Sequence, residues 1–360
     1  MNAFARVEAA EAVTTTHAVE FTGRGGEYFR IWIVNVALTL LTAGIYSAWA
    51  KVRTTRYFHG NTRVAGHAFE YHASAWRILL GRVIALVIFA TYTLSVIVFP
   101  ISFGLWFLAL GFVMPWLVRA AIRFNARNTS WRNVRFNFSA TYFEAFIAYV
   151  VWSVAALAFP FLIPYARRVH DYFYINHYSF DGKKFQTEFS AGRIYAIYLI
   201  GFVLLVAVIV VMIGVVAGFM VGQTRMPEVF GKLNLPIGPA DYSTIFLVIA
   251  GIAFSFIAVF VTTMVTNVAI SNTRLEGGFA LMSNASPWRV GWILITNTLL
   301  TILTLGFYYP FARVRLARYR MQKYALIASG DLDAFTSESL ENQSAIGEEI
   351  AGFFDFSFGL

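Results

Sequence analysis

The chain has 360 residues, of which 58% are hydrophobic and only 13% are charged, and it carries a net charge of +9. A soluble domain has about 45–50% apolar and about 25% charged residues, so this composition excludes an ordinary soluble fold and indicates a membrane protein. Cysteine is absent, which excludes disulfides and thiolate chemistry.

The positive charge lies in the middle of the chain. The first 20 residues are mildly acidic and have no apolar core that would suit a signal peptide, and residues 331–360 contain no Lys or Arg. We therefore divide the chain into an N-terminal tail (1–20), a membrane domain (21–325) and a weakly ordered acidic C-terminal tail (326–360). An excess of Lys and Arg beside apolar spans is typical of the positive-inside rule, and nucleic-acid binding is not expected.

The first apolar segment, residues 31–50, introduces a pattern that recurs along the chain. It contains Asn35, and it ends in a small-residue turn at Gly44 that is followed by Trp49. A basic cluster comes next, made of Lys51, Arg53 and Arg56. Residues 61–71 then have the Asn, Gly and aromatic composition of a short β-hairpin.

Versions of this pattern follow, which predicts degenerate internal repeats. The second has Trp116 and the basic residues Arg119 and Arg123, and the third has Arg167 and Arg168; both lead into predicted hairpins. The fourth keeps a hairpin near residues 272–277 and lacks the basic cluster. The fifth, at residues 310–320, keeps the basic residues Arg313, Arg315 and Arg318 and is predicted to lose its hairpin to the acidic tail.

Apolar segments between these patterns are of two kinds. Four long segments, 78–99, 101–118, 194–221 and 243–270, carry almost no charge and are long enough to cross a membrane as helices. Three shorter segments stand alone between basic patterns: 31–50, 142–163 and 290–309. The loop at residues 223–241 is predicted to lie on the non-cytoplasmic side.

The three shorter segments leave two topologies open. If all seven segments crossed, the third basic pattern would lie outside, against the positive-inside rule. If only the four long helices crossed, every hairpin would be cytoplasmic, and the shorter segments would re-enter or lie in the interface. We favour the second topology, because these segments contain Gly44, Pro160 and Gly306, and broken helices are tolerated at membrane depth only when they are protected. The predicted fold is thus an all-α polytopic membrane protein with short cytoplasmic β-hairpins and a cytoplasmic C-terminus.

Three stretches, Phe21–Phe29, Gly44–Arg53 and Asn61–Tyr71, resemble the YjgN-type family of bacterial inner-membrane proteins. The resemblance extends over about residues 20–325. It implies a polytopic protein of the bacterial inner membrane. Because the family has no characterised activity, the resemblance implies no catalytic or ligand-binding residues.

Catalytic and metal chemistry are not expected. The interiors of the long spans contain no Asp, Glu, Lys or His, whereas membrane enzymes and proton-coupled carriers usually keep an ionisable group at depth. The six histidines form no helical pair with the spacing of metal ligands. We therefore predict no catalytic residue, no metal and no cofactor.

Two groups of side chains are candidates for a functional surface. Aromatic and basic residues at the membrane boundary are placed to contact anionic lipid head groups, although topology alone also explains them: Trp49, Lys51, Arg53, Arg56, Trp116, Arg119, Arg123, Arg167, Arg168, Arg313, Arg315 and Arg318. Polar side chains inside the apolar segments either line a pathway or hydrogen-bond between helices, and we favour helix packing: Asn35, Asn297, Thr266 and Asn267.

A small-residue ridge, Gly214, Gly218 and Gly222, is predicted to allow close helix packing within or between protomers. The first functional hypothesis is a transporter or channel for a small or amphipathic solute, with its pathway between the repeats. The alternative is a non-catalytic envelope protein that binds anionic lipid or partner proteins through its basic cytoplasmic face. The predicted partner is the lipid bilayer, and homo-oligomer formation is left open.

Overall fold

The computed structural model describes residues 15–225 and 239–329, in which one order of elements, strand, helical pair, strand, occurs five times. The first two units are β1 (Thr15–Phe21), α1 (Gly25–Leu41), α2 (Ser47–Gly60), β2 (Thr62–Val64), and β3 (His67–Tyr71), α3 (Ala75–Val98), α4 (Ser102–Arg127), β4 (Thr129–Trp131). The third is β5 (Val134–Phe138), α5 (Tyr142–Phe146), the π-helical turn η1 (Ile147–Val151), α6 (Trp152–Ala158), η2 (Pro160–Leu162), α7 (Ile163–Asn176), β6 (Tyr178–Phe180). The last two are β7 (Lys183–Thr187), α8 (Ala191–Arg225), α10 (Pro239–Ser271), β8 (Thr273–Leu275), and β9 (Phe279–Ser283), α11 (Pro287–Leu303), α12 (Tyr309–Met321), β10 (Tyr324–Ala328).

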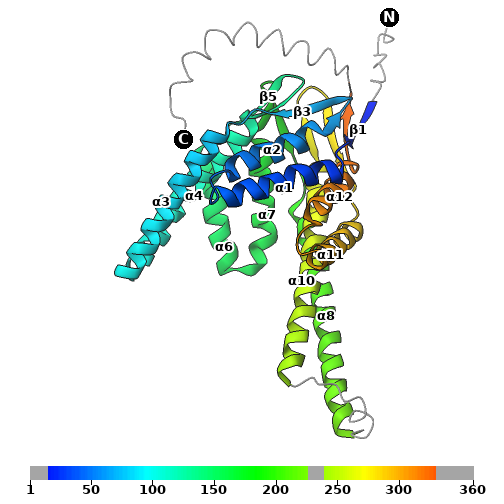
Figure 1. Cartoon of the computed structure of the whole chain (residues 1–360). Helices are drawn as coiled ribbons and strands as arrows, with labels where there is room; N and C mark the ends of the chain where they lie inside the picture. Colours follow the sequence, from blue (N-terminus) through cyan, green and yellow to red (C-terminus); the bar gives the residue numbers. More distant parts are fainter. Residues whose placement is uncertain (1–14, 226–238, 330–360) are drawn as a thin grey trace, which may run out of the picture.

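The ten strands form one closed antiparallel barrel, in the order β1-β10-β9-β8-β7-β6-β5-β4-β3-β2. In Figure 1 the barrel lies at one end of the molecule and the helical pairs extend from it. The predicted helical fold with short hairpins is thus confirmed in part: the described chain is mostly helical, but its strands form a closed barrel and not separate hairpins. The hairpins were predicted one by one, but their pairing into a barrel depends on contacts between distant segments that hydropathy does not report.

The two ends of the described chain close the barrel. Strand β1 pairs with β10, Thr15 opposite Ala328 and Ala18 opposite Ala325, and its last residues pair with β2. Within the described residues the fifth pattern keeps a strand, β10, but no hairpin follows it, because β10 pairs with β1 from the other end of the described chain. Both strands lie partly in ranges assigned to tails, 1–20 and 326–360; the rest of those tails and most of the predicted loop 223–241 lie outside the described residues.

Hairpin turns and helix ends explain why the sequence pattern recurs. In the first three hairpins, both turn residues have positive φ, as a two-residue type I′ turn requires: Ala65 and Gly66, Arg132 and Asn133, Asp181 and Gly182. Before three of the hairpins, an Asn side chain donates to a carbonyl one turn back in the helix, at 2.7 to 2.8 Å: Asn61, Asn128 and Asn272. The following Thr does the same at 2.7 to 2.9 Å: Thr62, Thr129 and Thr273. The Asn-Thr pair thus satisfies carbonyls at the helix end and begins the next strand.

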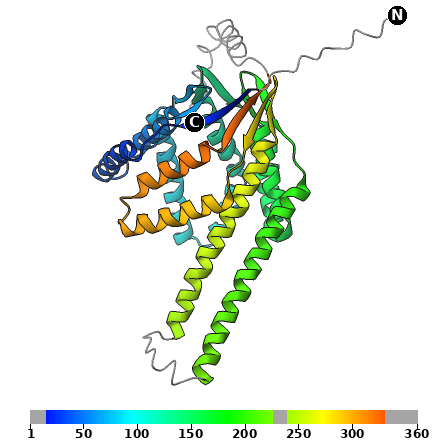
Figure 2. The ribbon, with the colours of Figure 1, turned by 90° about the vertical axis from the view of Figure 1, so that its right-hand side faces the viewer.

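Four helical segments are long and apolar enough to cross a membrane, which confirms the four predicted spans: Ala75–Val98, Ser102–Arg127, Ala191–Gly218 and Phe246–Ser271. They form two helical pairs, α3–α4 and α8–α10, and each pair leaves the barrel and returns to it (Figures 1 and 2). All described hairpins therefore lie on the same side of the four spans.

The three shorter apolar segments each turn back toward the barrel. Segment 31–50 is divided by a turn between α1 and α2, where Gly44 has φ of 94°, and segment 290–309 is divided in the same way at Gly306. Segment 142–163 turns at η2. In Figure 1, α1 and α2 lie across the molecule beneath the barrel, whereas α6 and α7 point along the long helices. This geometry agrees with the topology in which the shorter segments do not cross.

Labelling of single introduced cysteines should show on which side of the membrane each hairpin lies, because the chain has no cysteine of its own. We expect Asn133→Cys and Gly182→Cys, at two hairpin turns, to react with a membrane-impermeant maleimide from the cytoplasmic side only. Pro100→Cys, between the ends of α3 and α4, should react from the opposite side. Labelling of residue 182 from the periplasmic side would support seven crossings and contradict the fold.

Candidate functional site

A cavity of about 700 Å³ occupies the inside of the barrel. All ten strands contribute at least one lining side chain, because side chains alternate between the two faces of a strand and the inner set is apolar or aromatic. The rings of Phe136 and Phe180, for example, pack in a tilted arrangement with their centroids 4.9 Å apart. The cavity volume is within the range of about 300–1,000 Å³ that is typical of small-molecule sites.

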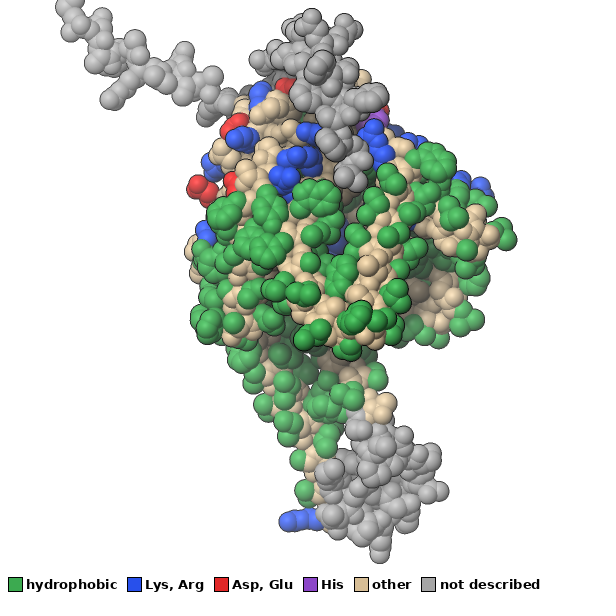
Figure 3. All heavy atoms as spheres, turned by 90° about the vertical axis from the view of Figure 1, so that its left-hand side faces the viewer, with side chains coloured by type: hydrophobic (Ala, Val, Ile, Leu, Met, Phe, Trp, Pro, Cys, Tyr) green, Lys and Arg blue, Asp and Glu red, His purple; other side chains and the backbone are tan. Residues whose placement is uncertain are grey.

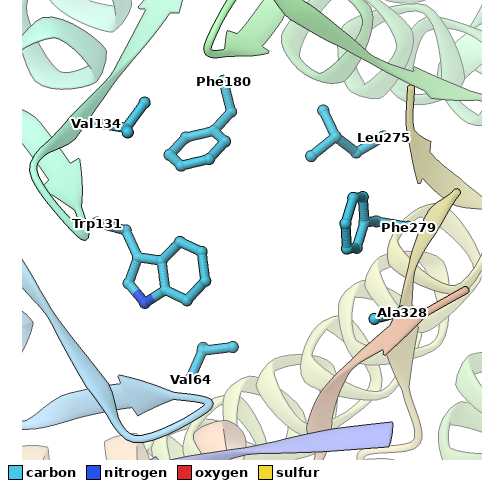
Figure 4. Close-up of a cluster of buried hydrophobic side chains, with 7 residues drawn as sticks. All are labelled: Val64, Trp131, Val134, Phe180, Leu275, Phe279 and Ala328. Atoms are coloured by element: carbon cyan, nitrogen blue, oxygen red, sulfur yellow. The ribbon is translucent and has the colours of Figure 1, made fainter. Parts of the chain in front are cut away.

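The hairpin end of the cavity is closed by a cluster of buried apolar side chains. Figure 4 shows these side chains pointing inward around the barrel axis: Val64, Trp131, Val134, Phe180, Leu275, Phe279 and Ala328. All of them lie at the ends of strands that adjoin the hairpin turns or, for Ala328, at the end of β10. Val134 and Ala328 are fully buried, so this end of the barrel is packed as a core.

The opposite end of the cavity faces the helices. It is lined by residues from the last turn or two of the helices that lead back to the barrel, among them Phe58, Ala126, Ile175, Ile270 and Met321. The cavity therefore extends from the hairpin turns toward the membrane side of the protein.

The cavity lining carries no formal charge. The residues that line it, all in the described part of the chain, include no Asp, Glu, Lys or Arg. Burial lowers the pKa of His59, whose Nδ1 lies 3.0 Å from the carbonyl of Thr55, so its imidazole is neutral near pH 7. Burial also raises the pKa of Tyr178 and Tyr324, so both stay protonated. Such an uncharged, mainly apolar surface suits an apolar ligand.

Several predicted lipid-binding cations also make contacts within the protein that hold the fold together. Four arginines on the helices that lead back to the barrel donate to a backbone carbonyl at or just after the first strand of the following unit, at 2.8 to 3.1 Å, with β1 taken as the strand that follows α12 and β10 around the barrel: Arg56 to Tyr71, Arg123 to Phe138, Arg168 to Phe189 and Arg318 to Gly23. In the fourth unit, which lacks the basic cluster, Asn267 takes this place and donates to Ala285 at 2.8 Å. We call these five contacts the helix–strand clamps.

Three further cations also have partners within the protein. Arg167 forms an ion pair of 2.9 Å with Asp171, and burial raises the pKa of that carboxyl group. Arg313 lies over the ring of Phe58 at 5.0 Å. Arg315 donates to the side chain of Thr296 at 2.8 Å and to that of Asn297 at 3.1 Å.

The remaining predicted lipid contacts stay on the surface. Lys51 and Arg53 are exposed on α2, Arg119 is half-buried on α4, and Trp116 is 38% exposed. Trp49 is half-buried and contacts the ring of Trp76. The structure thus brings none of the twelve predicted residues into the barrel cavity.

The predicted polar groups are positioned between helices. Asn297 is 5% exposed and donates to the Ala312 carbonyl at 3.0 Å, and Asn35 makes the corresponding contact with Ala50 at 3.5 Å. Asn267 belongs to a helix–strand clamp, and Thr266 is half-buried. None of the four lines the cavity.

The glycine ridge does not pack against another helix of the same protomer. A side chain at Gly214 or Gly218 would meet nothing within 4 Å, and the surroundings of Gly222 lie outside the described residues. The close approach of α8 and α10 is at Gly201 instead, where an added Cβ would lie 2.5 Å from Val261. For Gly214 and Gly218, packing against lipid or another protomer stays a prediction.

Comparison with known proteins identifies the family. The model of a bacterial protein family of unknown function, DUF898, matches residues 16–353. The chain belongs to this family. The DUF898 chain is 32% identical over 129 residues to inner membrane protein YjgN of Salmonella typhimurium and 29% identical over 127 residues to that of Escherichia coli O157:H7. Each match covers 35% of the chain and 32% of the relative, so the chain matches about a third of each relative's length. No solved structure matches.

These matches confirm the resemblance to YjgN-type proteins. Together with the four membrane-length helices, they place the DUF898 chain in the inner membrane as a multi-pass protein. They assign it no activity, because the family has none that is known.

The barrel cavity was not predicted from the sequence of this DUF898 protein. A signal for it was present, since apolar residues alternate with polar ones in some strands, as Val134, Phe136 and Phe138 do in β5. Alternation in strands of three to five residues shows which side chains share a face. It does not show that five such faces meet around one space.

Proposed function

We propose that this protein binds an amphipathic molecule whose apolar chain enters the barrel cavity, and that it acts as a carrier for such a solute in the inner membrane. The observation that supports this most directly is an uncharged, apolar cavity of about 700 Å³ at the membrane side of a closed barrel. Each methylene group moved from water into such a space contributes about 0.8 kcal/mol. Cavities lined in this way hold water poorly and take up apolar ligands.

The chemistry of the lining favours a hydrocarbon chain over a polar substrate. A sugar, an amino acid or a nucleotide would lose its hydrogen bonds to water, and the cavity offers few in exchange: the imidazole of His59, the amide of Asn125 and a few hydroxyl groups. His59 and Asn125 lie at the ends of α2 and α4, where the helices face the cavity, so the polar part of a ligand would lie at that end. A ligand with an apolar chain and a small uncharged polar part therefore fits the cavity best.

Filling the cavity should abolish binding. Leu281 points into the cavity from β9, and Ala280 on the same strand does not line it. We expect Leu281→Trp to weaken binding of a brominated fatty acid at least tenfold, and Ala280→Trp to leave it unchanged. Binding is measured by quenching of tryptophan fluorescence in purified protein, and Trp131→Phe should remove most of the quenching, because Trp131 lines the cavity. Equal binding by both Trp variants would contradict the proposal.

A second candidate function is the binding of anionic lipid through the basic face. Figure 3 shows Lys and Arg side chains gathered beside an apolar belt. Lys51 and Arg53 are exposed on α2. Arg56 and Arg318 are exposed as well, and each also donates to a backbone carbonyl in a helix–strand clamp. A protein that only holds lipid at its surface would bind the fatty acid weakly and would not respond to Leu281→Trp, so the same experiment separates the two functions.

Three further inferences accompany this proposal. The basic residues near the barrel favour a cytoplasmic barrel and C-terminus. The five units with their corresponding clamps favour an origin by internal repetition, which would place an amphipathic pathway between related halves as in many carriers. Both candidate functions are non-catalytic, in keeping with the expectation that the protein is not an enzyme.

A further inference from the structure

An arginine lies within the first membrane-length helix, outside the cavity. Arg82 is exposed in α3 and lies about 10 Å along the helix from Ala75, at 1.5 Å per residue. No residue of α3 is buried, so this part of the helix contacts its surroundings more than it contacts the protein. A charged side chain at such a position is costly unless an opposite charge or water accompanies it.

The protein supplies Arg82 with a hydroxyl group and no carboxylate. Its guanidinium donates to the hydroxyl of Ser47, the first residue of α2. No Asp or Glu among the described residues forms an ion pair with it. The positive charge is therefore directed to the junction of α2 and α3, where an anion would compensate it.

The same junction carries a second cation and two tryptophans. Lys51 lies four residues after Ser47, on the same face of α2, and is exposed. The rings of Trp49 and Trp76 meet edge to face with centroids 5.0 Å apart, and Trp76 is 68% exposed. Exposed tryptophans of this kind are typical of the level of lipid head groups in a membrane.

We propose that the junction of α2 and α3 binds the phosphate group of an anionic phospholipid, with Arg82 and Lys51 as its cationic ligands. The planar guanidinium offers two parallel donors to phosphate oxygens, and the lysine adds a point charge. The tryptophan pair packs against the glycerol region and the adjoining acyl chains. The site is separate from the barrel cavity, because none of these residues lines it.

The surroundings favour a lipid over a soluble phosphate. The turn that ends at Ser47 is preceded by Leu40 and Leu41, which are 76% and 82% exposed, and α3 itself exposes Leu86 to 66%. Large exposed side chains of this kind are stable beside hydrocarbon and unfavourable in water. An anion bound here therefore lies against apolar surface that acyl chains can cover.

The site can be tested by native mass spectrometry of the full-length protein in a neutral detergent with added phosphatidylglycerol. We expect Arg82→Ala to weaken binding of the tightest-held lipid about tenfold, as for the loss of one charge-assisted contact. The matched control is Arg77→Ala, which removes an exposed charge from a different face of α3. Since alanine suits an apolar helix better than arginine does, Arg82→Ala should fold, and its fatty-acid binding in the barrel should stay unchanged.

Equal losses in both variants would show a general effect of charge and overturn the proposal, and so would unchanged binding in Arg82→Ala. Inorganic phosphate supplies the remaining control. If millimolar phosphate displaces the lipid from the wild-type protein, the site selects a soluble anion and the lipid assignment fails. If Trp76→Ala weakens lipid binding while phosphate has no effect, the assignment is supported.

Discussion

Replacing Trp131 with alanine should lower the free energy of unfolding by about 3–5 kcal/mol, as for other large side chains removed from a core. Trp131 is 6% exposed and belongs to the apolar cluster that closes the hairpin end of the barrel. Its ring lies 5.9 Å from that of Phe180 and 6.5 Å from that of Phe69, and its indole N–H donates to the carbonyl of His67 at 3.2 Å. The substitution removes all of these contacts together.

The effect should be confined to the inner face of the barrel. Arg135 is exposed and lies opposite Ser130 in the neighbouring strand, so Arg135→Ala should change stability by less than about 0.5 kcal/mol. Both free energies can be measured by reversible unfolding in mixed detergent micelles. A Trp131→Ala protein as stable as the wild type would mean that the barrel is not a packed unit. A large loss in Arg135→Ala would mean that its outer face is buried against something else.

The membrane part of the fold could be predicted, because hydrophobicity and length are properties of single segments. The four spans and the turns at Gly44, Pro160 and Gly306 follow from composition and from backbone rules that apply within a few residues. The barrel could not be predicted in this way. Its closure by β1 and β10 joins residues from opposite ends of the described chain, and strands of three to five residues carry too little pattern to specify their partners.

In the candidate site, too, features of single segments could be predicted and contacts between distant segments could not. Basic clusters were easy to find, and their position beside the membrane suggested lipid head groups. The sequence did not reveal that Arg56, Arg123 and Arg318 donate to backbone carbonyls at or just after the first strand of the following unit, because those contacts form only when the barrel does. Arg82 was visible as an isolated charge in an apolar segment. The proposal that it binds an anion depends on its contact with Ser47 in a different helix, which the sequence does not show.

Asn297→Leu should destabilise the protein by about 2–4 kcal/mol, whereas Asn35→Leu should cost less than about 1 kcal/mol. The two asparagines occupy corresponding places between paired helices, but their hydrogen bonds differ. Asn297 donates to Ala312 at 3.0 Å and accepts from Arg315 at 3.1 Å. Leucine at this position would leave a buried carbonyl and a guanidinium with fewer partners.

The hydrogen bonds of the Asn35 side chain contribute less stability than those of Asn297. Its contact with the Ala50 carbonyl is 3.5 Å long, and its side-chain oxygen is buried without a hydrogen-bond partner. Leucine removes that unpartnered oxygen, which offsets part of the lost contact. Thermal unfolding in detergent, read by loss of the monodisperse peak in size-exclusion chromatography, compares the two variants under the same conditions.

The difference between the two variants decides between packing and a pathway. If the asparagines act as packing groups, stability should follow the hydrogen bonds, and fatty-acid binding in the barrel should be unchanged in the folded fraction of both. If they line a pathway, both variants should lose solute movement in liposomes to a similar degree, whatever their stability. We expect the first result, because Asn297 and its partners Ala312 and Arg315 satisfy one another within a single helical pair, α11–α12, and leave no free polar group for a solute.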